Sequence, residues 1–396
     1  MSACTDARIE LGATRALFET KDPKARAFTD RLLRRAAQGD GGEIRVDWDD
    51  GPRWLARHAQ IQYALGGTGP QAAWTLATLG APALTALEDR SPHMMAQVFG
   101  GMLLVEDGTV RPASQVAPRG PRRPDVFIVE YTQGIPAGGV LPPRSSRIIV
   151  RFGDPGLERD EEFYALTPSL AADAGGGLVS GFNCVPSLEL PAEIDRVFAL
   201  SKSWRRNGLE TVHLELAGYE TPSARDSVLD ASAGAVTSLG MSLSEFRQLR
   251  PDSSDIFVGM IELGQRFGLS RVCVHADDWA ATATCGDPEV EQAALMAGCL
   301  LASARAAAGG PVKPSGAPSG ARFELSLPTG GTRQGNWATV CCPTPYLPRP
   351  ATTLGLGDSF TAGCLLILGQ RRARAEAHTR PLPVQSGVAT TTTQTK

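Results

Sequence analysis

The sequence lacks the features that mark several large classes of protein. Its 396 residues carry a net charge of -3, so the excess of basic residues typical of nucleic-acid-binding proteins is missing. Residues 1–19 contain acidic side chains among the apolar ones and no basic segment followed by an apolar run, which argues against a secretion signal. The longest apolar stretches, residues 293–304 and 360–368, are too short to cross a membrane and predict buried helices.

Cysteine is present, but without the spacing of a zinc site. None of the 8 cysteines forms a CxxC pair, and Cys184, Cys273, Cys299 and Cys364 lie in apolar surroundings. This usage predicts reduced core thiols in a cytoplasmic protein rather than a disulfide or zinc framework. Hydrophobic residues make up 42% and charged residues 20% of the chain, which is ordinary for a soluble globular enzyme.

The pattern of predicted strands and helices divides the chain. Short strands rich in Val, Ile and aromatic residues are expected at 126–131 and 147–153, and they predict a small sheet domain built from residues 38–65 and 125–157. After residue 178 strands and helices alternate regularly, which predicts a mostly parallel, helix-covered sheet. We assign residues 1–37, 66–124 and 158–370 to this large α/β domain. Residues 371–396 show no apolar periodicity and are expected to be disordered.

A glycine-rich turn precedes the apolar helix expected at 360–368. The segment 353–358 reads TLGLGD, so Gly355, Leu356, Gly357 and Asp358 lie at a helix N-terminus, where unpaired N–H groups favour anions. Asp358 has two interpretations. It is either an N-cap carboxylate or a general base aimed at a substrate hydroxyl beside a phosphoryl group held by the turn.

Carboxylates follow two neighbouring strands of the expected parallel sheet. His213 and Glu215 lie near the end of one strand, and Glu245 follows the next. Ligands bind beyond these strand ends, and two carboxylates there could share a hydrated magnesium ion. The alternatives are a hydrogen-bonded core histidine at 213 and an exposed residue in a helical first turn at 245.

The succession of these segments resembles the ADP-dependent glucokinase and phosphofructokinase family of the ribokinase-like superfamily. The resemblance rests on GGEIRV, ALGGTGPQAAWTLATLG, FIVEYTQG, PPRSSRIIV, LVSGF, TVHLELA, SLGMSLSEF, RVCVHADDWA and TTLGLGDSF, in that order along the chain. It implies a three-layer α/β/α large domain with a small β-sheet lid, ADP as phosphoryl donor and Mg²⁺ as cofactor.

The resemblance also assigns roles to residues. The family's GxGD motif falls on Gly355 to Asp358, which implies Asp358 as catalytic base and the turn as an anion hole. Its HxE and NxxE motifs fall on His213, Glu215 and Glu245, with Glu215 and Glu245 at the metal, and Arg147 corresponds to its phosphate-contacting arginine. The residues implied to bind nucleotide are Arg147, His275, Thr353, Leu354 and Gly357.

The sugar end departs most from the family pattern. The residues implied to bind sugar are Asp6, Glu43, Gly66, Gly67 and Thr68. Val126 stands where the family has a histidine, and Ser242 and Ser146 stand where it has asparagines. The family's first strand should precede residue 10, so we expect this strand to be missing or very short, with Asp6 as its surviving aspartate.

Several functions stay open at this point. The first is transfer of the ADP β-phosphoryl group to a neutral hexose such as glucose, because an acidic Glu43 would repel a sugar phosphate. Fructose 6-phosphate is the alternative acceptor, with Glu43 then only a solvated turn residue. A non-catalytic nucleotide- or sugar-binding relative and an ATP-dependent kinase are further alternatives. The expected partners are a small-molecule sugar and ADP, without nucleic acid or membrane, in a monomer or small homo-oligomer.

Overall fold

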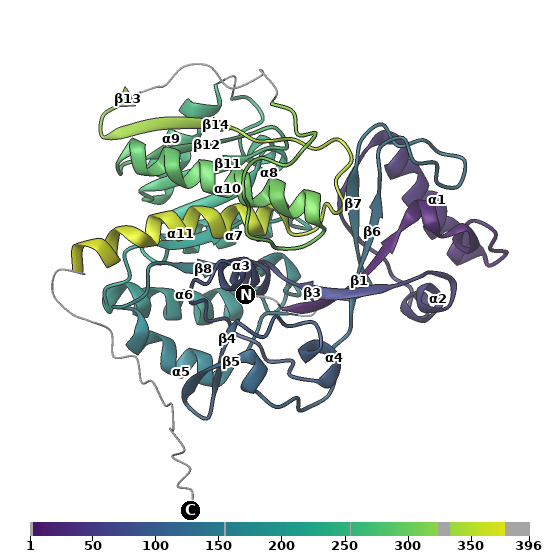
Figure 1. Ribbon diagram of the computed structural model, residues 1–396, viewed down its shortest axis with the longest axis horizontal. Coiled ribbons are helices and arrows are strands. Elements are labelled where there is room, and N and C mark those ends of the chain that lie inside the picture. The colour runs from purple at the N-terminus through teal and green to yellow at the C-terminus, as the bar shows by residue number, and fades with distance from the viewer. Residues whose placement is uncertain (1–2, 154–155, 254, 324–332, 377–396) are drawn as a thin grey trace, which may run out of the picture.

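The computed structural model describes residues 3–153, 156–253, 255–323 and 333–376. Within them, a seven-stranded and a five-stranded sheet each carry their own helices (Figure 1). In spatial order, the strands of the seven-stranded sheet are β13 (Arg333–Gln334), β14 (Trp337–Pro343), β12 (Trp279–Thr284), β11 (Arg271–His275), β10 (Ser238–Ser242), β9 (Val212–Glu215) and β8 (Gly177–Val179).

The seven-stranded sheet is parallel in one half and antiparallel in the other. Strands β8 to β11 pair in parallel, whereas β12 pairs antiparallel with both β11 and β14. The predicted alternation of strands and helices is therefore confirmed for the parallel half. The helices of this part are α5 (Glu161–Leu170), α6 (Leu190–Arg206), α7 (Pro222–Ala231), α8 (Leu243–Leu249), α9 (Ile256–Phe267), α10 (Pro288–Ala308) and α11 (Leu356–Glu376).

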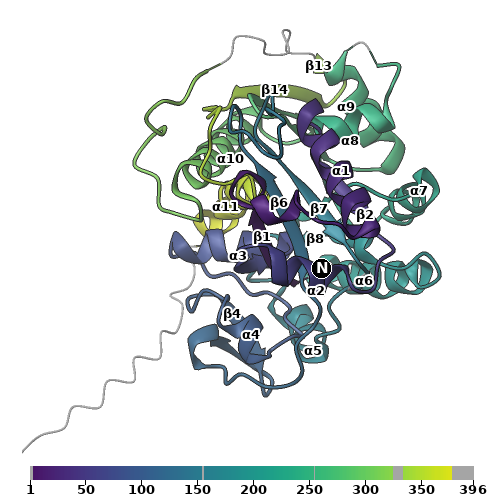
Figure 2. The same ribbon diagram turned by 90° about the vertical axis from the view of Figure 1, so that its right-hand side faces the viewer.

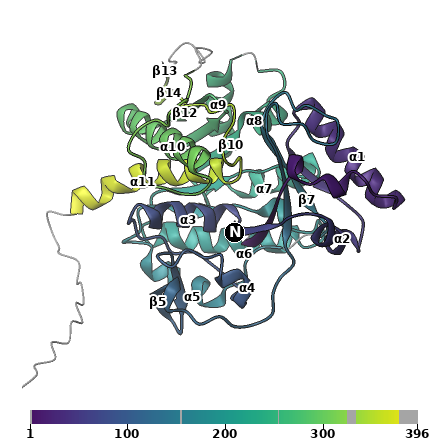
Figure 3. The ribbon, with the colours of Figure 1, turned by 45° about the vertical axis from the view of Figure 1, so that its right-hand side comes forward.

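Alternating side chains of one strand explain the three layers. In β11, Val272 and Val274 join the core cluster that α6, α7 and α9 complete on one face. Cys273, between them, faces the opposite cluster with residues of α10 and α11. Because both faces of the strand are covered, its sequence is almost continuously apolar. Helix α11 lies against α10 and against α3 (Thr68–Thr78) (Figure 3).

The five-stranded sheet stands beside the larger sheet and is turned towards the viewer in Figure 2. Its strands, in spatial order, are β2 (Gly42–Arg45), β7 (Ser146–Arg151), β6 (Val126–Tyr131), β1 (Cys4–Glu10) and β3 (Gln62–Gly66). Helices α1 (Pro23–Gln38) and α2 (Gly51–His58) accompany it. The segments 126–131 and 147–153 thus contribute to a sheet separate from the large one, as their pattern indicated.

Local signals fix helix α1 and its contact with this sheet. The Asp22 side chain accepts hydrogen bonds from Lys24 N (2.8 Å) and Ala25 N (3.1 Å), and the helix ends at Gly39 with φ of 74°. Its apolar face places Phe28 and Leu32 in the core of the five-stranded sheet.

Three predicted boundaries were wrong. Residues 1–37 were assigned to the large domain, but β1 pairs with β3 and β6, and α1 shares their core. The opening strand β1 was expected to be missing or very short, but it spans 7 residues. Hydrogen bonds to β3 on one side and β6 on the other hold it in extended conformation. Helix α11 continues to Glu376, so residues 371–376 are helical, and the rest of the tail predicted to be disordered lies outside the described residues.

A hairpin of β4 (Leu103–Glu106) and β5 (Thr109–Pro112), with the short helix α4 (Pro92–Met95), completes the structure. Within the described ranges, none of the helices combines the length and hydrophobicity needed to cross a bilayer.

Candidate active site

A large cleft is lined by residues of both sheets. Its volume is ≈ 1150 Å³. The last residues of three parallel strands, Glu215, Ser242 and His275, lie in its wall, as expected for a ligand site at the carboxyl ends of such strands. The predicted site residues that line this cleft are Asp6, Glu43, Gly67, Thr68, Arg147, Glu215, Glu245, His275, Thr353, Leu354, Gly355, Leu356, Gly357 and Asp358.

The glycine turn leads into α11 as the sequence indicated. Gly355 has a φ of 69°, which favours glycine, and α11 begins at Leu356. The first hydrogen bond of the helix runs from Ser359 N to Gly355 O, at 3.0 Å. The N–H groups of Leu356, Gly357 and Asp358 therefore have no partner inside the helix, and these residues line the cleft. The turn can accept an anion here.

Asp358 does not behave as a helix cap. Within the described part of the chain, its carboxylate accepts no hydrogen bond from the backbone of its own helix, and it interacts with the Thr68 hydroxyl. Burial raises the pKa of Asp358 above its ordinary value, although the positive charges of Arg305 and Arg147 oppose the shift. A half-buried carboxylate with raised pKa and free acceptor positions suits a general base.

Arg147 brings a positive charge to the same end of the cleft. It lies on β7, opposite Glu130 of β6 in the register of the sheet. Its Nε is buried without a hydrogen-bond partner, and no carboxylate of the described residues lies within ion-pair distance of it. Because Arg147 is half-buried in the cleft wall and no nearby carboxylate neutralises its charge, its guanidinium is suited to an anionic ligand.

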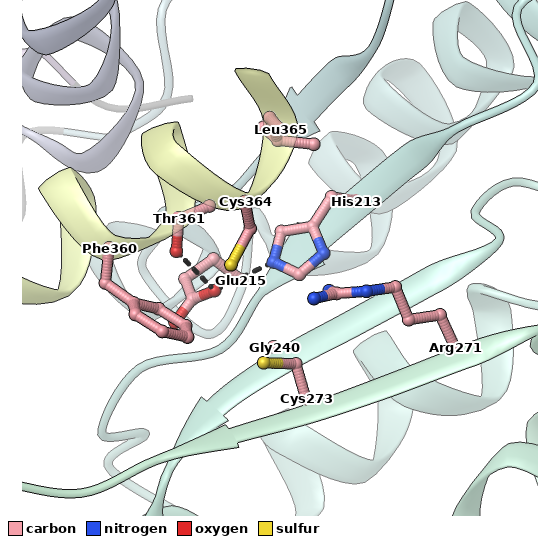
Figure 4. A pocket seen from close by; sticks show the side chains of 9 residues that line it. All are labelled: His213, Glu215, Gly240, Arg271, Cys273, Phe360, Thr361, Cys364 and Leu365. Carbon is pink, nitrogen blue, oxygen red and sulfur yellow. Dashed lines mark hydrogen bonds and ion pairs between the residues drawn. The ribbon is translucent and has the colours of Figure 1, made fainter. Parts of the chain in front are cut away.

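Glu215 accepts hydrogen bonds from two histidines and a threonine. Figure 4 shows those from His213 and Thr361. Its Oε2 accepts from His213 Nε2 (2.9 Å) and Thr361 Oγ1 (3.2 Å), and its Oε1 accepts from His275 Nε2 (3.1 Å). Burial alone would raise the pKa of Glu215, but the two histidines outweigh it and lower the pKa to about 2. Since His213 also bonds Ser238 Oγ at 2.7 Å, it is a fully partnered core histidine that orients Glu215.

Glu245 caps the helix in which it lies. Ser242 N donates to Glu245 Oε2 (2.7 Å), and Glu245 N donates to Ser242 Oγ (3.3 Å), which together form a capping box on α8. The alternative of an exposed first-turn residue is incorrect in one respect, because Glu245 is half-buried in the cleft wall. Ser242, which replaces the family's asparagine, serves as the N-cap.

The two carboxylates fit a hydrated magnesium ion better than a directly bound one. No group of three or more His, Cys, Asp or Glu side chains in the described part of the chain could hold a metal. Glu215 and Glu245 nevertheless line the same cleft, and the charge of Glu215 acts on Glu245. Because both oxygens of Glu215 already accept direct hydrogen bonds, its contact with Mg²⁺ would run through water, as Mg²⁺ commonly allows.

The end of the cleft that the resemblance assigns to the sugar, called the sugar end below, is built around Asp6 and the turn before α3. Asp6 is buried at 3% exposure. Gly66 itself does not line the cleft, since it packs against this side chain: a Cβ on Gly66 would lie 2.3 Å from Asp6 Oδ1. Burial raises the pKa of Asp6 to about 7, with the charge of Asp358 contributing. Gly67 (φ 90°) then carries the chain to Thr68 beside Asp358.

Glu43 is neither a turn residue nor solvated. It lies in strand β2 and is paired in parallel with Ile149 of β7. Arg151 Nε donates to Glu43 Oε1 at 2.5 Å, and Asn183 Nδ2 donates to Oε2 at 3.1 Å. The carboxylate that was expected to repel a sugar phosphate is therefore balanced by a buried arginine, so the repulsion argument loses most of its force.

Two candidate functional residues were not identified from the sequence. Glu130 on β6 accepts hydrogen bonds from Thr353 N (2.7 Å) and Arg8 Nη2 (2.6 Å). It therefore connects the five-stranded sheet to the segment that precedes the glycine turn. Arg305 on α10 bonds the carbonyl of Leu354 at 2.8 Å from behind the turn. Glu130 is the only charged residue of β6, and Arg305 is the only charged residue of α10 after Glu291, so this pattern could have identified them.

Solved structures with the same fold cover almost the whole chain. An ADP-dependent kinase in complex with fructose-6-phosphate and ADPβS matches with a TM-score of 0.74 and 19% identity over 93% of this chain and 92% of that one. A phosphofructokinase from Pyrococcus horikoshii OT3 with AMP matches with a TM-score of 0.70 and 18% identity over 94% and 97%. No curated protein sequence matches the chain.

The family is established independently of these structures. The model of the ADP-specific phosphofructokinase/glucokinase conserved region matches residues 23–367. This span contains the glycine turn, Arg147, Glu215 and Glu245, and leaves out β1 with Asp6. The expected three-layer ribokinase-like fold is confirmed. The chain belongs to the ADP-dependent phosphofructokinase and glucokinase family of sugar kinases.

Proposed function

We propose that this chain transfers the β-phosphoryl group of ADP to a sugar hydroxyl, releasing AMP and a sugar phosphate. One observation carries the proposal: Asp358, the unpaired Arg147 and the free N–H groups of the glycine turn line the same cleft as Asp6 and Thr68. A base, an anion hole and a cation thus face a wall of hydroxyl-binding residues. These are the parts that phosphoryl transfer requires.

Asp358 accepts the proton of the attacking hydroxyl in this mechanism. Thr68, from the turn on the sugar side, interacts with Asp358 and so sets the carboxylate near the acceptor. A carboxylate whose pKa is raised by burial is a stronger base than one in water, while Arg147 and Arg305 keep it ionised.

The glycine turn and Arg147 receive the charge of the transferred group. The N–H groups at residues 356–358 and the Arg147 guanidinium stabilise the phosphoryl oxygens as the bond to AMP breaks. Glu215 and Glu245 would hold a hydrated Mg²⁺ ion, which when bound supplies further positive charge to the phosphates. His275, Thr353 and Leu354 complete the nucleotide side of the cleft.

The five-stranded sheet serves as a lid in this proposal. It contributes Asp6, Glu43 and Arg147 to a cleft whose opposite wall belongs to the large sheet. Closure of one wall upon the other would exclude water from the reactive phosphoryl group and so suppress hydrolysis.

The acceptor is a hexose. A neutral hexose such as glucose remains the first candidate, because the carboxylates of Glu43 and Asp6 can accept hydrogen bonds from sugar hydroxyls. Fructose 6-phosphate is the second candidate, and the ion pair of Glu43 with Arg151 favours it by removing the net negative charge from this wall.

A donor and acceptor panel tests the proposal. The purified chain is incubated with Mg²⁺, ADP or ATP, and glucose, fructose 6-phosphate or other hexoses, while AMP and ADP release is measured. We expect AMP from ADP with a hexose and little turnover with ATP. A kcat/KM for fructose 6-phosphate above that for glucose would select the second acceptor. Binding of ADP without turnover on any sugar would instead identify a non-catalytic relative.

A further inference from the structure

Arg305 is a buried arginine directly behind the glycine turn. It lies in the last turn of α10, is 3% exposed and does not line the cleft. Its Nε donates to the Leu354 carbonyl at 2.8 Å, and its Nη1 donates to Ser359 Oγ at 3.3 Å. The guanidinium therefore holds the residue before the turn and the first turn of α11 together.

The glycine at 355 is required by this arginine as well as by its own backbone. A Cβ on Gly355 would lie 2.4 Å from Arg305 Cζ. The guanidinium thus packs against one side of the turn, while the other side faces the cleft. The cation therefore lies directly behind the backbone that faces the cleft.

The charge of Arg305 has no partner of opposite sign at contact distance. Among the described residues, no carboxylate lies within 4.0 Å of its nitrogens, and its hydrogen-bond acceptors are neutral. Burial lowers the pKa of Arg305 to about 10, and the charges of Asp358 and Asp6 act against this shift. Leaving a cation buried without a counter-charge costs free energy that an anionic ligand at the turn would offset.

The same guanidinium reaches the sugar side. Its Nη2 donates to Gln71 Oε1 at 2.6 Å, and Gln71 in turn donates to the carbonyl of Leu65, at the end of β3. Gln71 N also donates to Gly67 O at 3.0 Å. The turn before α3 and the glycine turn at residues 355–358 therefore share one buried hydrogen-bond network.

We propose that Arg305 is a positioning residue that fixes the glycine turn in its anion-binding conformation. Its buried guanidinium also supplies positive charge to the anion hole from behind the turn. This inference rests on the proposed function, because it assigns the transferred phosphoryl group of ADP to the turn. It differs from the role of Arg147, which contacts the phosphoryl group directly. The charge of Arg305 acts through the backbone and on Asp358.

The test compares nucleotide binding and kinetics of three variants. Arg305→Gln removes the charge, and Arg305→Lys keeps it without the planar fork. Gln71→Glu pairs the charge with a carboxylate of nearly unchanged shape, and it also removes the hydrogen bond to the Leu65 carbonyl. Arg90→Gln is the matched control, since Arg90 is a buried arginine (5% exposed) near β4, outside the cleft. Affinities for ADP and AMP are measured by calorimetry, because AMP lacks the phosphate that would occupy the turn.

We expect Arg305→Gln and Gln71→Glu to weaken ADP binding about 10-fold with AMP binding unchanged, and to lower kcat about 100-fold. Arg305→Lys should retain more of the ADP affinity and more of the kcat than Arg305→Gln does. In Arg305→Gln, the acidic limb of the pH profile of kcat should move to higher pH by about one unit, because the charge that lowers the pKa of Asp358 is gone. The groups that act on Asp358 are Arg305, Arg147, Glu215, Asp6 and Thr68, and only the first changes.

The result can separate this inference from the proposed function. If the wild-type chain binds ADP more tightly than AMP but turns over no sugar, the proposed activity fails while the binding comparison still decides the role of Arg305. Equal losses of ADP and AMP affinity in Arg305→Gln, or a loss no larger than in Arg90→Gln, would overturn the inference. A wild-type chain that binds neither nucleotide would overturn both.

Discussion

The two ends of the cleft handle charge in opposite ways. At the proposed sugar end, Glu43 is paired with Arg151, and Asp6 is buried against Gly66. At the proposed phosphoryl end, Arg147 and Arg305 have no carboxylate at ion-pair distance among the described residues. Glu43 is neutralised by pairing and Asp6 favours the neutral form through burial, so this wall can bind hydroxyls. Cations without a carboxylate partner are instead stabilised when an anion binds. This difference supports the proposal that the phosphoryl group binds beside Arg147 and the glycine turn.

The largest expected effect comes from the carboxylate at the phosphoryl end. Asp358→Asn keeps the size of the side chain but cannot accept a proton, so kcat should fall by about 1000-fold or more while ADP affinity is retained. Steady-state AMP release and calorimetry measure the two quantities. Asp230→Asn is the control, since Asp230 is exposed and distant from the cleft lining. A kcat within 10-fold of wild type would rule out Asp358 as the base.

Paired and unpaired arginines should respond differently to the same substitution. Arg147→Met removes an unpaired cation, so kcat should fall about 100-fold with little loss of stability. Arg151→Met removes the nearest cation from Glu43, which keeps only Asn183 and the more distant Arg45, so the free energy of unfolding should drop by about 3 kcal/mol, with a smaller effect on kcat. Denaturant unfolding and AMP release measure both variants. If the two variants lost stability and activity in the same proportion, the contrast between the two ends would be wrong.

The smallest effect concerns the pH dependence of stability at Asp6. Its pKa in the folded chain, about 7, lies above the ordinary value of 3.8, so the folded state favours the neutral carboxyl. Stability is therefore lost as the pH rises from about 4 through about 7. Asp6→Asn removes this loss and should raise Tm by about 2 °C or more at pH 8, with no gain at pH 3.5. A Tm difference that is the same at both pH values would contradict the prediction.

Local sequence signals predicted the backbone around the glycine turn better than the N-terminal part of the fold. The turn at 355–358 and the strand end at Glu215 follow from glycine spacing and strand periodicity, which are local properties, whereas His275 was named only through the family resemblance. The placement of β1 on the five-stranded sheet depends on pairing with β3 and β6, which lie more than 50 residues after it in the sequence, and α1 packs on the core of the same sheet. No local pattern specifies such a pairing.

Tertiary partners also decide what a charged residue does. Glu43 was expected to face a sugar or solvent, but its carboxylate bonds Arg151, 108 positions along the chain. No local pattern likewise predicts the hydrogen bond between Arg305 and Gln71, which are 234 positions apart. Residue type predicted that these side chains are charged, and only the fold determined which charges are compensated.

The most direct test of the account is a crystal structure of the chain with AMP, a hexose and fluoroaluminate, which mimics the transferring phosphoryl group. We predict that the fluoride atoms lie within hydrogen-bond distance of the Arg147 guanidinium and of N–H groups at residues 356–358. We also predict that the acceptor hydroxyl lies against Asp358. Fluoroaluminate bound away from both the glycine turn and Arg147 would contradict the assignment of this end of the cleft to phosphoryl transfer.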